Sequence, residues 1–230
     1  MWTRKELKTN AKGILKANYW KVFLATIIIA LFTSASTSSS SQSVRDESQA
    51  VTATMSSMDF GTLLAAAALI FTACLVVFLV SWVFKIFVAN PFLLGAQKLI
   101  LNCKDNSAKC GDIFFGFKNS YLNVAKTLFL RDLFIGLWSL LLVIPGIVKA
   151  YEYRMVVYLL AEHPDMSWKE AKATSREMMN GQKWNSFVLD LSFIGWHILG
   201  VCTLGLVETF YTVPYMQVTN AELYYALKEN

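Results

Sequence analysis

The sequence predicts an all-α, polytopic membrane helical bundle of about six transmembrane spans, with interfacial amphipathic helices. Two observations predict this class. The 230 residues are 55% hydrophobic with a mean hydropathy of +0.44, which exceeds the apolar share of ordinary soluble domains. The apolar residues are also gathered in long runs, and runs of about 20 residues are what a hydrocarbon core roughly 30 Å thick requires of a spanning helix. Residues 1–230 are therefore expected to form a single integral membrane domain.

The chain is expected to begin with an interfacial helix over residues 1–17, on the inner membrane surface. Thr3-Arg-Lys-Glu6 has the spacing of a capping box. Leu7, Ala11 and Leu15 then recur on one helical face with lysines around them, as a helix lying on a membrane requires. Anionic lipid is an expected partner of these lysines, in addition to the bilayer itself, and plain anchoring is the simpler alternative.

The first apolar run, Val22–Phe32, is interpreted as a span and not as the core of a signal peptide. The small residues Ser34-Ala35-Ser36 resemble a processing site, but the segment before the apolar run is long for a signal peptide. Residues 34–60 are rich in Ser and Thr and are expected to form a flexible outer loop.

The second span is expected over Gly61–Phe84. Asn90-Pro91 is expected to kink or end its helix, because proline lacks a backbone N–H. Residues 102–123 are expected to form a polar inner loop. The third and fourth spans lie on either side of Leu142-Val-Ile-Pro-Gly146, whose Pro and Gly predict a tight outer turn.

An inner amphipathic helix is expected over residues 164–182, between the fourth and fifth spans. Ser167-Trp-Lys-Glu170 has capping-box spacing, and Asn180-Gly181 supplies a C-terminal stop. The fifth span is expected over Ser186–Val207, with two ionisable interruptions. The final segment, Glu208–Leu227, is the least apolar and is expected to be a sixth span or a helix packed at the interface.

The distribution of Lys and Arg predicts the orientation of the chain. Positive charges accumulate in cytoplasmic loops, and most of the 21 cations precede the first span or lie between the second and third and the fourth and fifth. Both termini are therefore expected in the cytoplasm. The net charge of +5 is interpreted as this orientation signal, and no nucleic-acid partner is expected.

Ionisable residues inside the fifth span are the candidate functional residues. Asp190, His197 and Glu208 fall within about 20° of one line on a continuous helix at 100° per residue. Ionisable groups at the centre of a membrane helix cost about 2.5–3.5 kcal/mol each, so this face is expected to point into the bundle. Arg154 and Arg131 are predicted at the same depth as Asp190, roughly 10–12 Å from the inner ends of their helices, and either is its expected partner.

Further members of this cluster lie on the third and fourth spans. Asp132 is expected on the layer of Asp190, and Lys149 and Glu152 are an i, i+3 pair at roughly the level of His197. The favoured interpretation is a structural lock of paired charges that fixes helix register. The alternative is a polar cavity for a substrate, ion or proton.

No catalytic residue, metal site or cofactor is expected. Asp190, Ser192 and His197 are triad residue types, but on one helix Ser192 points about 160° from Asp190 and His197 lies roughly 10 Å further along. Cys103 and Cys110 are separated by six residues, which is looser than the usual zinc spacing. The glycines of the chain do not form a phosphate-binding loop motif.

Five phrases carry a family resemblance: "RKELKTNAKGILKANYW", "IPGIVKAYEY", "EAKATSREMMNGQKW", "FVLDLSFIGW" and "VPYMQVTNAELYYAL". They resemble the bacterial multi-pass membrane family catalogued as domain of unknown function 975. The resemblance implies a protein of several helices in the bacterial plasma membrane. It implies no established reaction, so no catalytic residue is carried over.

The function expected from these observations is non-enzymatic. The leading hypothesis is a membrane protein that binds or helps to move a small molecule, peptide or lipid, or supports a membrane complex. An enzyme acting on lipid at the membrane is the competing class, but no nucleophile or metal beside a base can be assembled from these residues. A purely structural or assembly role is the third hypothesis, and the sequence identifies no protein partner.

Overall fold

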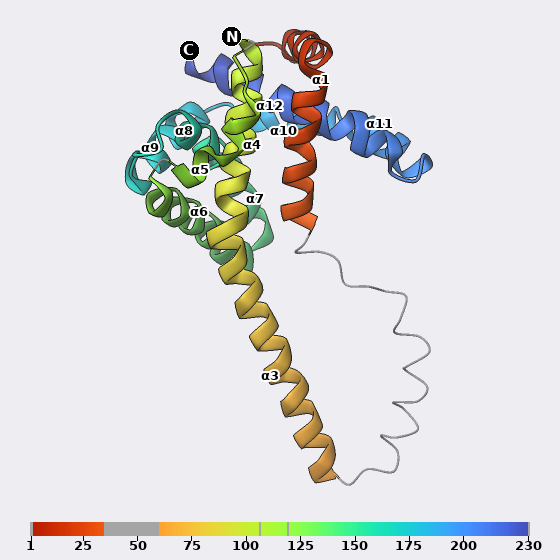
Figure 1. Ribbon diagram of the computed structural model, residues 1–230, viewed down its shortest axis with the longest axis vertical. Helices are drawn as coiled ribbons and strands as arrows, with labels where there is room; N and C mark the ends of the chain where they lie inside the picture. Colours follow the sequence, from red (N-terminus) through yellow and green to blue (C-terminus); the bar gives the residue numbers. More distant parts are fainter. Residues whose placement is uncertain (1, 35–59, 106, 119, 230) are drawn as a thin grey trace.

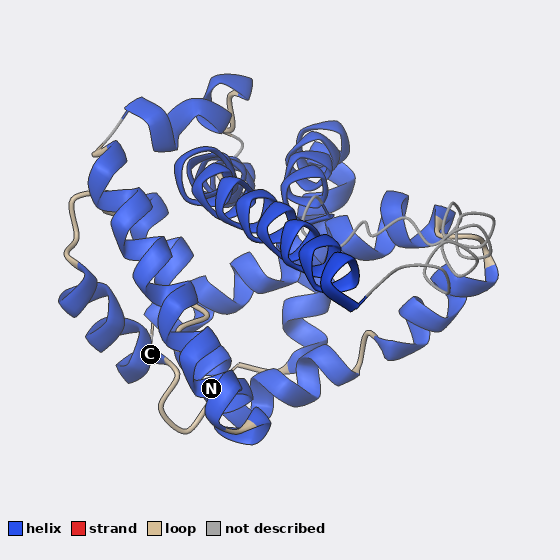
Figure 2. Cartoon of the chain, turned by 90° about the horizontal axis from the view of Figure 1, so that it is seen from below, coloured by secondary structure: helices blue, strands red, loops and turns tan. Residues whose placement is uncertain are grey.

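The computed structural model describes residues 2–34, 60–105, 107–118 and 120–229 (Figure 1). Within these residues it contains helices and no strand (Figure 2), which confirms the all-α prediction. The predicted outer loop, residues 34–60, lies outside the described residues except for its two end positions. In chain order the elements are α1 (Arg4–Ser34), α3 (Phe60–Phe84), η1 (Lys85–Ala89), α4 (Asn90–Lys104), η2 (Cys110–Phe114), α5 (Phe115–Lys118), α6 (Tyr121–Leu141), α7 (Val143–Glu152), α8 (Val156–Glu162), α9 (Trp168–Met178), α10 (Lys183–Leu191), α11 (Ile194–Cys202), η3 (Glu208–Thr212) and α12 (Val213–Lys228).

Helix α1 bends at Asn18, whose φ of −126° and ψ of 31° depart from helical values. Its first half lies across one end of the molecule and its second half descends beside α4 (Figure 1). The apolar residues of the first half, Leu7, Ala11 and Leu15, are buried within the protein. The apolar face of this amphipathic helix therefore packs against the protein's own helices.

Helices α3 and α4 form one long rod interrupted by the π-helical turn η1 (Figure 1). The interruption directly precedes Pro91, which has no N–H to donate to the carbonyl of Phe87, four residues earlier. The hydroxyl of Tyr121 in α6 donates to that carbonyl at 2.7 Å. The predicted irregularity at Asn90-Pro91 is thus a π-turn, after which the helix continues, and a side chain from α6 supplies a donor.

The same arrangement recurs before α12. The π-helical turn η3 precedes Pro214, and the carbonyl of Phe210, four residues earlier, accepts a hydrogen bond of 2.9 Å from the hydroxyl of Tyr19 in α1. Two proline-linked irregularities are therefore each joined by a tyrosine to a helix distant in the sequence.

Among the described residues, three helical segments are long and apolar enough to cross a membrane: Arg4–Leu31, Leu64–Lys104 and Lys183–Cys202. Six spans are not confirmed. The expected fourth span is broken by a turn between α7 and α8, and the 10 residues of α7 rise only about 15 Å, half of a hydrocarbon core.

The expected fifth span does not continue to Val207. It breaks between α10 and α11, where Lys8 donates to the carbonyl of Ser192 at 3.3 Å and lies 4.3 Å from the ring centroid of Phe193. After α11 the chain reverses through Leu204 and Gly205, which have positive φ values of 53° and 84°.

The predicted inner amphipathic helix is present as α9. Ser167 and Glu170 form the capping box, with the Ser167 amide donating to Glu170 Oε2 at 2.9 Å and the Glu170 amide donating to Ser167 Oγ at 3.4 Å. The Ser167 hydroxyl, which also donates to Oε2 at 2.8 Å, and the Ser167 amide lower the pKa of Glu170 below its usual value, because hydrogen bonds to the carboxylate favour its charged form.

Residues 102–123, expected to be a loop, contain the short helices η2 and α5. Both pack closely on α4. A methyl group at Gly95 would overlap the carbonyl of Ile113, and one at Gly116 would overlap the carbonyl of Pro91. Gly95 in α4 and Gly116 in α5 therefore allow the two backbones to approach more closely than any side chain permits.

Candidate functional site

The ion pair of Arg154 and Asp190 joins two distant segments. Arg154 lies in the turn between α7 and α8, and Asp190 lies in the last turn of α10. The guanidinium donates two hydrogen bonds of 2.8 Å, one to each carboxylate oxygen. Tyr151 in α7 donates to Oδ2 of Asp190 at 2.8 Å, and Arg154 also donates to Asn220 in α12 at 2.7 Å. The network therefore connects α7, α10 and α12.

The carboxylate of Asp190 is fully hydrogen-bonded by side chains of this network. Both oxygens of Asp190 accept hydrogen bonds from protein groups, and the fork of two parallel bonds is the strongest geometry available to an arginine and a carboxylate. The exposed fractions of the two side chains are 17% for Arg154 and 31% for Asp190. Of the two partners expected for Asp190, the structure places Arg154 against it and not Arg131.

Arg131 instead binds its neighbour. Its Nη2 lies 2.7 Å from Oδ1 of Asp132, and Lys85 of η1 lies 3.3 Å from Oδ2 of the same carboxylate. Asp132 therefore does not join the network of Asp190. Its carboxylate holds α6 to the π-turn that precedes α4.

Glu152 is the carboxylate with the most cationic partners. Its side chain is 3% exposed, and its oxygens lie 3.1 Å from Lys149, 3.1 Å from Lys183 and 3.4 Å from Arg176. The hydroxyl of Ser175 also donates to the Glu152 carbonyl at 2.7 Å. The predicted pair of Lys149 and Glu152 is present, and cations from α9 and the start of α10 complete the cluster. Three cations therefore surround one buried acid.

His197 and Glu208 face each other across the reversal that follows α11. Nδ1 of His197 and Oε1 of Glu208 are 2.8 Å apart. The prediction that Asp190, His197 and Glu208 share one face of a continuous helix is wrong for Glu208, because the turn at Leu204 and Gly205 separates it from α11. His197 and Glu208 meet because the chain folds back on itself.

The next residues to place are those that were considered for a catalytic triad or a metal site. Ser192 turns its hydroxyl to the Leu189 carbonyl at 2.5 Å and not toward His197. The four cysteines are free, with Cys103 buried and Cys110 exposed. In the part of the chain that the structure describes, no group of three His, Cys, Asp or Glu residues is placed to hold a metal ion.

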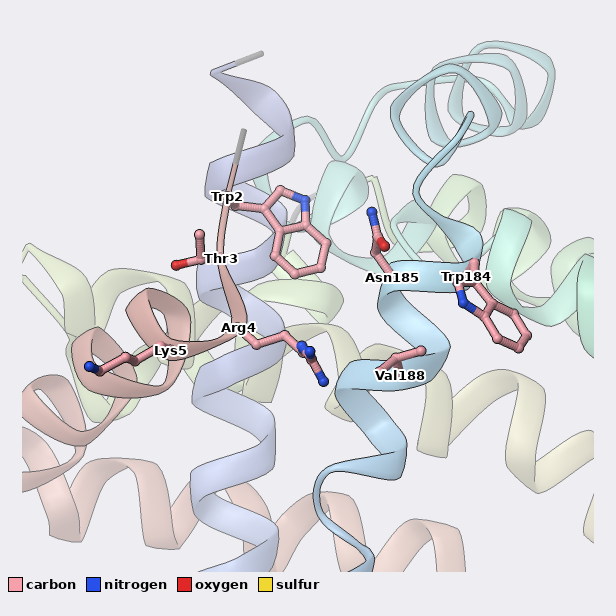
Figure 3. Close-up of a pocket in the computed structure, with 7 residues that line it drawn as sticks. All are labelled: Trp2, Thr3, Arg4, Lys5, Trp184, Asn185 and Val188. Atoms are coloured by element: carbon pink, nitrogen blue, oxygen red, sulfur yellow. The ribbon is translucent and has the colours of Figure 1, made fainter.

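Two cation-lined clefts were not predicted. One, of about 790 Å³, lies between residues 2–5 and the start of α10 (Figure 3). The other, of about 590 Å³, lies on α9 and the start of α10 and is lined by Lys169, Lys172, Arg176 and Lys183 with the carboxylate of Glu177. Lys169, Lys172 and Arg176 are spaced by 3 and 4 residues and share one face of α9, which was the available signal for the second cleft. Lys183 joins them from the start of α10. The first cleft is formed by segments that are far apart in the sequence, so no local spacing pattern predicts it.

Comparison with known sequences identifies one family over most of the chain. The sequence model of the family described as "Protein of unknown function (DUF975)" matches residues 71–230. No curated protein and no solved structure matches the chain.

Proposed function

The chain belongs to the DUF975 family, and from this premise we propose that it is a non-enzymatic integral membrane protein that binds a small molecule, peptide or lipid at its cation-rich surface. We place it in the bacterial plasma membrane with both termini in the cytoplasm. The buried charges then act as the lock that holds its helices in register.

The observation that carries this proposal is the contrast between interior and surface cations. Arg154 is engaged by Asp190, and Lys149 by Glu152, so these interior charges are already neutralised. Both clefts keep unpaired cations: Arg4 and Lys5 line one without any carboxylate. In the other, Arg176 and Lys183 are paired with Glu152, and Lys169 and Lys172 remain beside the single carboxylate of Glu177. Surplus positive charge in a concave surface attracts anionic groups. Binding is therefore expected at the surface, and the interior supplies stability.

Transport through the interior is less well supported. A pathway for an ion or substrate needs groups that exchange protein partners for ligand, and the Asp190 carboxylate is held by Arg154 and Tyr151 at 2.8 Å. An enzyme needs a nucleophile beside a base, and Ser192, the hydroxyl nearest to Asp190 in the sequence, bonds its own helix.

Binding is tested by thermal unfolding of the purified chain in one detergent with anionic, neutral and cationic small molecules, peptides and lipids. A ligand present at about 100 times its Kd stabilises the folded state by about 2.7 kcal/mol, which a shift in Tm reports. A shift with anionic compounds and none with their neutral analogues is expected. Turnover of a compound, or no shift with any compound, would contradict the proposal.

Membrane topology is tested with the native thiol of Cys110, which is exposed in the segment between α4 and α6. The other three cysteines are replaced by alanine. A membrane-impermeant maleimide is expected to label Cys110 only after the cells are permeabilised. Labelling of intact cells at the same rate would place this segment outside and contradict the proposed orientation.

A further inference from the structure

The cleft beside α10 is built from two segments that are far apart in the sequence, residues 2–5 and 184–188. In Figure 3, the side chains of Trp2 and Arg4 extend from the N-terminal segment toward α10, and Asn185 projects from α10 on the facing side. Its volume of about 790 Å³ is in the range of pockets that enclose a ligand. The cleft therefore exists only when α1 and α10 are both in place.

The charge of the cleft is positive and not neutralised by an acid. Arg4 and Lys5 belong to its lining, and no carboxylate does. Glu6, the closest acid in the sequence, interacts with Thr3 at 3.5 Å and lines a different cleft. In Figure 3 Arg4 extends toward α10 and Lys5 extends away from it, so an anion in this cleft meets the Arg4 guanidinium and no competing carboxylate.

A hydrogen-bond donor at the same place lacks an acceptor. Nε1 of Trp2 is buried from solvent and makes no hydrogen bond in the structure. A buried N–H without a partner is unfavourable, and such groups are uncommon in folded proteins. A small turn of the indole toward the cleft would let this N–H donate to an acceptor bound beside Arg4 and would remove this deficit.

The α10 wall of the cleft carries Asn185 and Val188, and the Trp184 ring extends from the other side of the same helix (Figure 3). Trp184 is 71% exposed, and its ring centroid lies 5.4 Å from that of Phe187, with Val188 beside them on the same helix. Exposed tryptophans with an apolar body and a polar N–H are typical of the membrane–water interface. A ligand that fits this wall has an apolar part next to its anionic group, and a phospholipid has both.

We propose that this cleft binds the phosphate group of an anionic phospholipid, with Arg4 and the indole N–H of Trp2 as donors and the apolar part of the lipid beside the exposed side chains of α10. The inference rests on the proposed function, because it names the ligand class of a membrane protein that binds and does not react. It assigns phosphate binding to Trp2 and Arg4. The amphipathic pattern of the N-terminal helix alone does not distinguish this role from plain anchoring.

Native mass spectrometry of the full chain, with phosphatidylglycerol or phosphatidylcholine added to the detergent, measures lipid affinity directly. Wild type is expected to bind phosphatidylglycerol more tightly. Arg4→Gln is expected to weaken that binding about five-fold, which corresponds to about 1 kcal/mol for one cation near an anionic headgroup. Trp2→Phe keeps an aromatic ring, removes only the indole N–H and is expected to weaken binding as well.

The matched control is Lys16→Gln. Lys16 is an exposed cation of the same helix outside the cleft, so its substitution removes the same charge and is expected to leave the affinity unchanged. Equal weakening by Arg4→Gln and Lys16→Gln would show unspecific attraction and overturn the proposal, as would equal affinity for the two lipids. Competition by soluble glycerol phosphate as strong as by the lipid would assign the cleft to a free phosphate ester and also overturn it.

Failure of this inference and failure of the proposed function give different results. If no compound stabilises the chain, the binding function itself fails. If a ligand stabilises wild type and Arg4→Gln equally, only the assignment of the cleft fails. Thermal unfolding of each variant without lipid tests whether its fold is intact. Arg4→Gln, at an exposed position, is expected to unfold at the temperature of wild type.

Discussion

Arg154 and Asp190 meet through two parallel hydrogen bonds of 2.8 Å, although they belong to segments that the sequence separates by the whole of α8 and α9. The arginine lies in a break of one helical segment and the aspartate at the end of another. This geometry makes the pair a joint between α7, α10 and α12.

Asp190→Asn is expected to destabilise the protein by about 3 kcal/mol. This is the lower end of the usual cost of removing one partner of a buried ion pair, because the Asp190 side chain is 31% exposed. The loss arises because Arg154 keeps its charge without a counter-ion. Thermal unfolding in one detergent or nanodisc measures it. The double variant Arg154→Met with Asp190→Leu is expected to be more stable than the single variant. Unchanged stability of Asp190→Asn would mean that the charge is not a structural lock.

Glu152→Gln is expected to cost about 3 kcal/mol, because Lys149, Lys183 and Arg176 then lie close together without the buried carboxylate. Unfolding curves at low and high salt check this, since added anions partly replace the lost charge. The control is Glu177→Gln on the exposed face of α9, expected within about 0.5 kcal/mol of wild type. Equal effects of the two substitutions would contradict the assignment.

Tyr121→Phe and Tyr19→Phe are each expected to cost about 1 kcal/mol, the typical net value of one hydrogen bond. Each change removes only the hydroxyl that donates to the carbonyl four residues before a proline. Tyr211 packs against Trp196, and no hydrogen bond of its hydroxyl is found among the described residues, so Tyr211→Phe is the matched control. If all three variants unfold at the same temperature as wild type, the tyrosines do not support the π-turns.

Gly95→Ala is expected to destabilise the protein by about 2 kcal/mol or more, because its methyl group would overlap the carbonyl of Ile113 and force η2 away from α4. Gly111→Ala is the control, since no atom lies within 4 Å of a methyl group placed there. Hydrogen exchange of residues 107–118 is expected to rise in the first variant and not in the second. Unchanged exchange in Gly95→Ala would show that the close approach is not needed.

Local features of the fold were predictable because they depend on residues within a few positions of one another. The capping box of Ser167 and Glu170 and the stop at Gly181 were assigned from spacing alone, and Gly181 has the positive φ of 71° that a glycine stop permits. The irregularity at Pro91 was likewise predicted, but its form as a π-turn was not. A proline specifies that a hydrogen bond is missing, and only the neighbouring helix decides how the carbonyl is satisfied.

The partners of the ionisable residues were only partly predictable. Helical phase assumes a continuous helix, and the assumption failed at Gly205, so Glu208 meets His197 across a turn, and Asp190 belongs to a separate network. At the interruption between α10 and α11 the Ser192 carbonyl accepts a hydrogen bond from Lys8, which comes from the first helix of the chain. No sequence pattern within the fifth apolar run predicts that contact.

The sequence by itself determined that the chain is helical, that its apolar runs are long enough for membrane-spanning helices and that its interior carries charges in need of partners. Hydropathy, helical period and capping depend on residues close together in the chain, so they can be predicted from the sequence. The tertiary structure alone decided that Arg154 and not Arg131 holds Asp190, that three cations surround Glu152, and that Trp2 and Arg4 face α10 across a cleft. These relationships depend on the angles and breaks between helices, which are set by packing between segments far apart in the sequence.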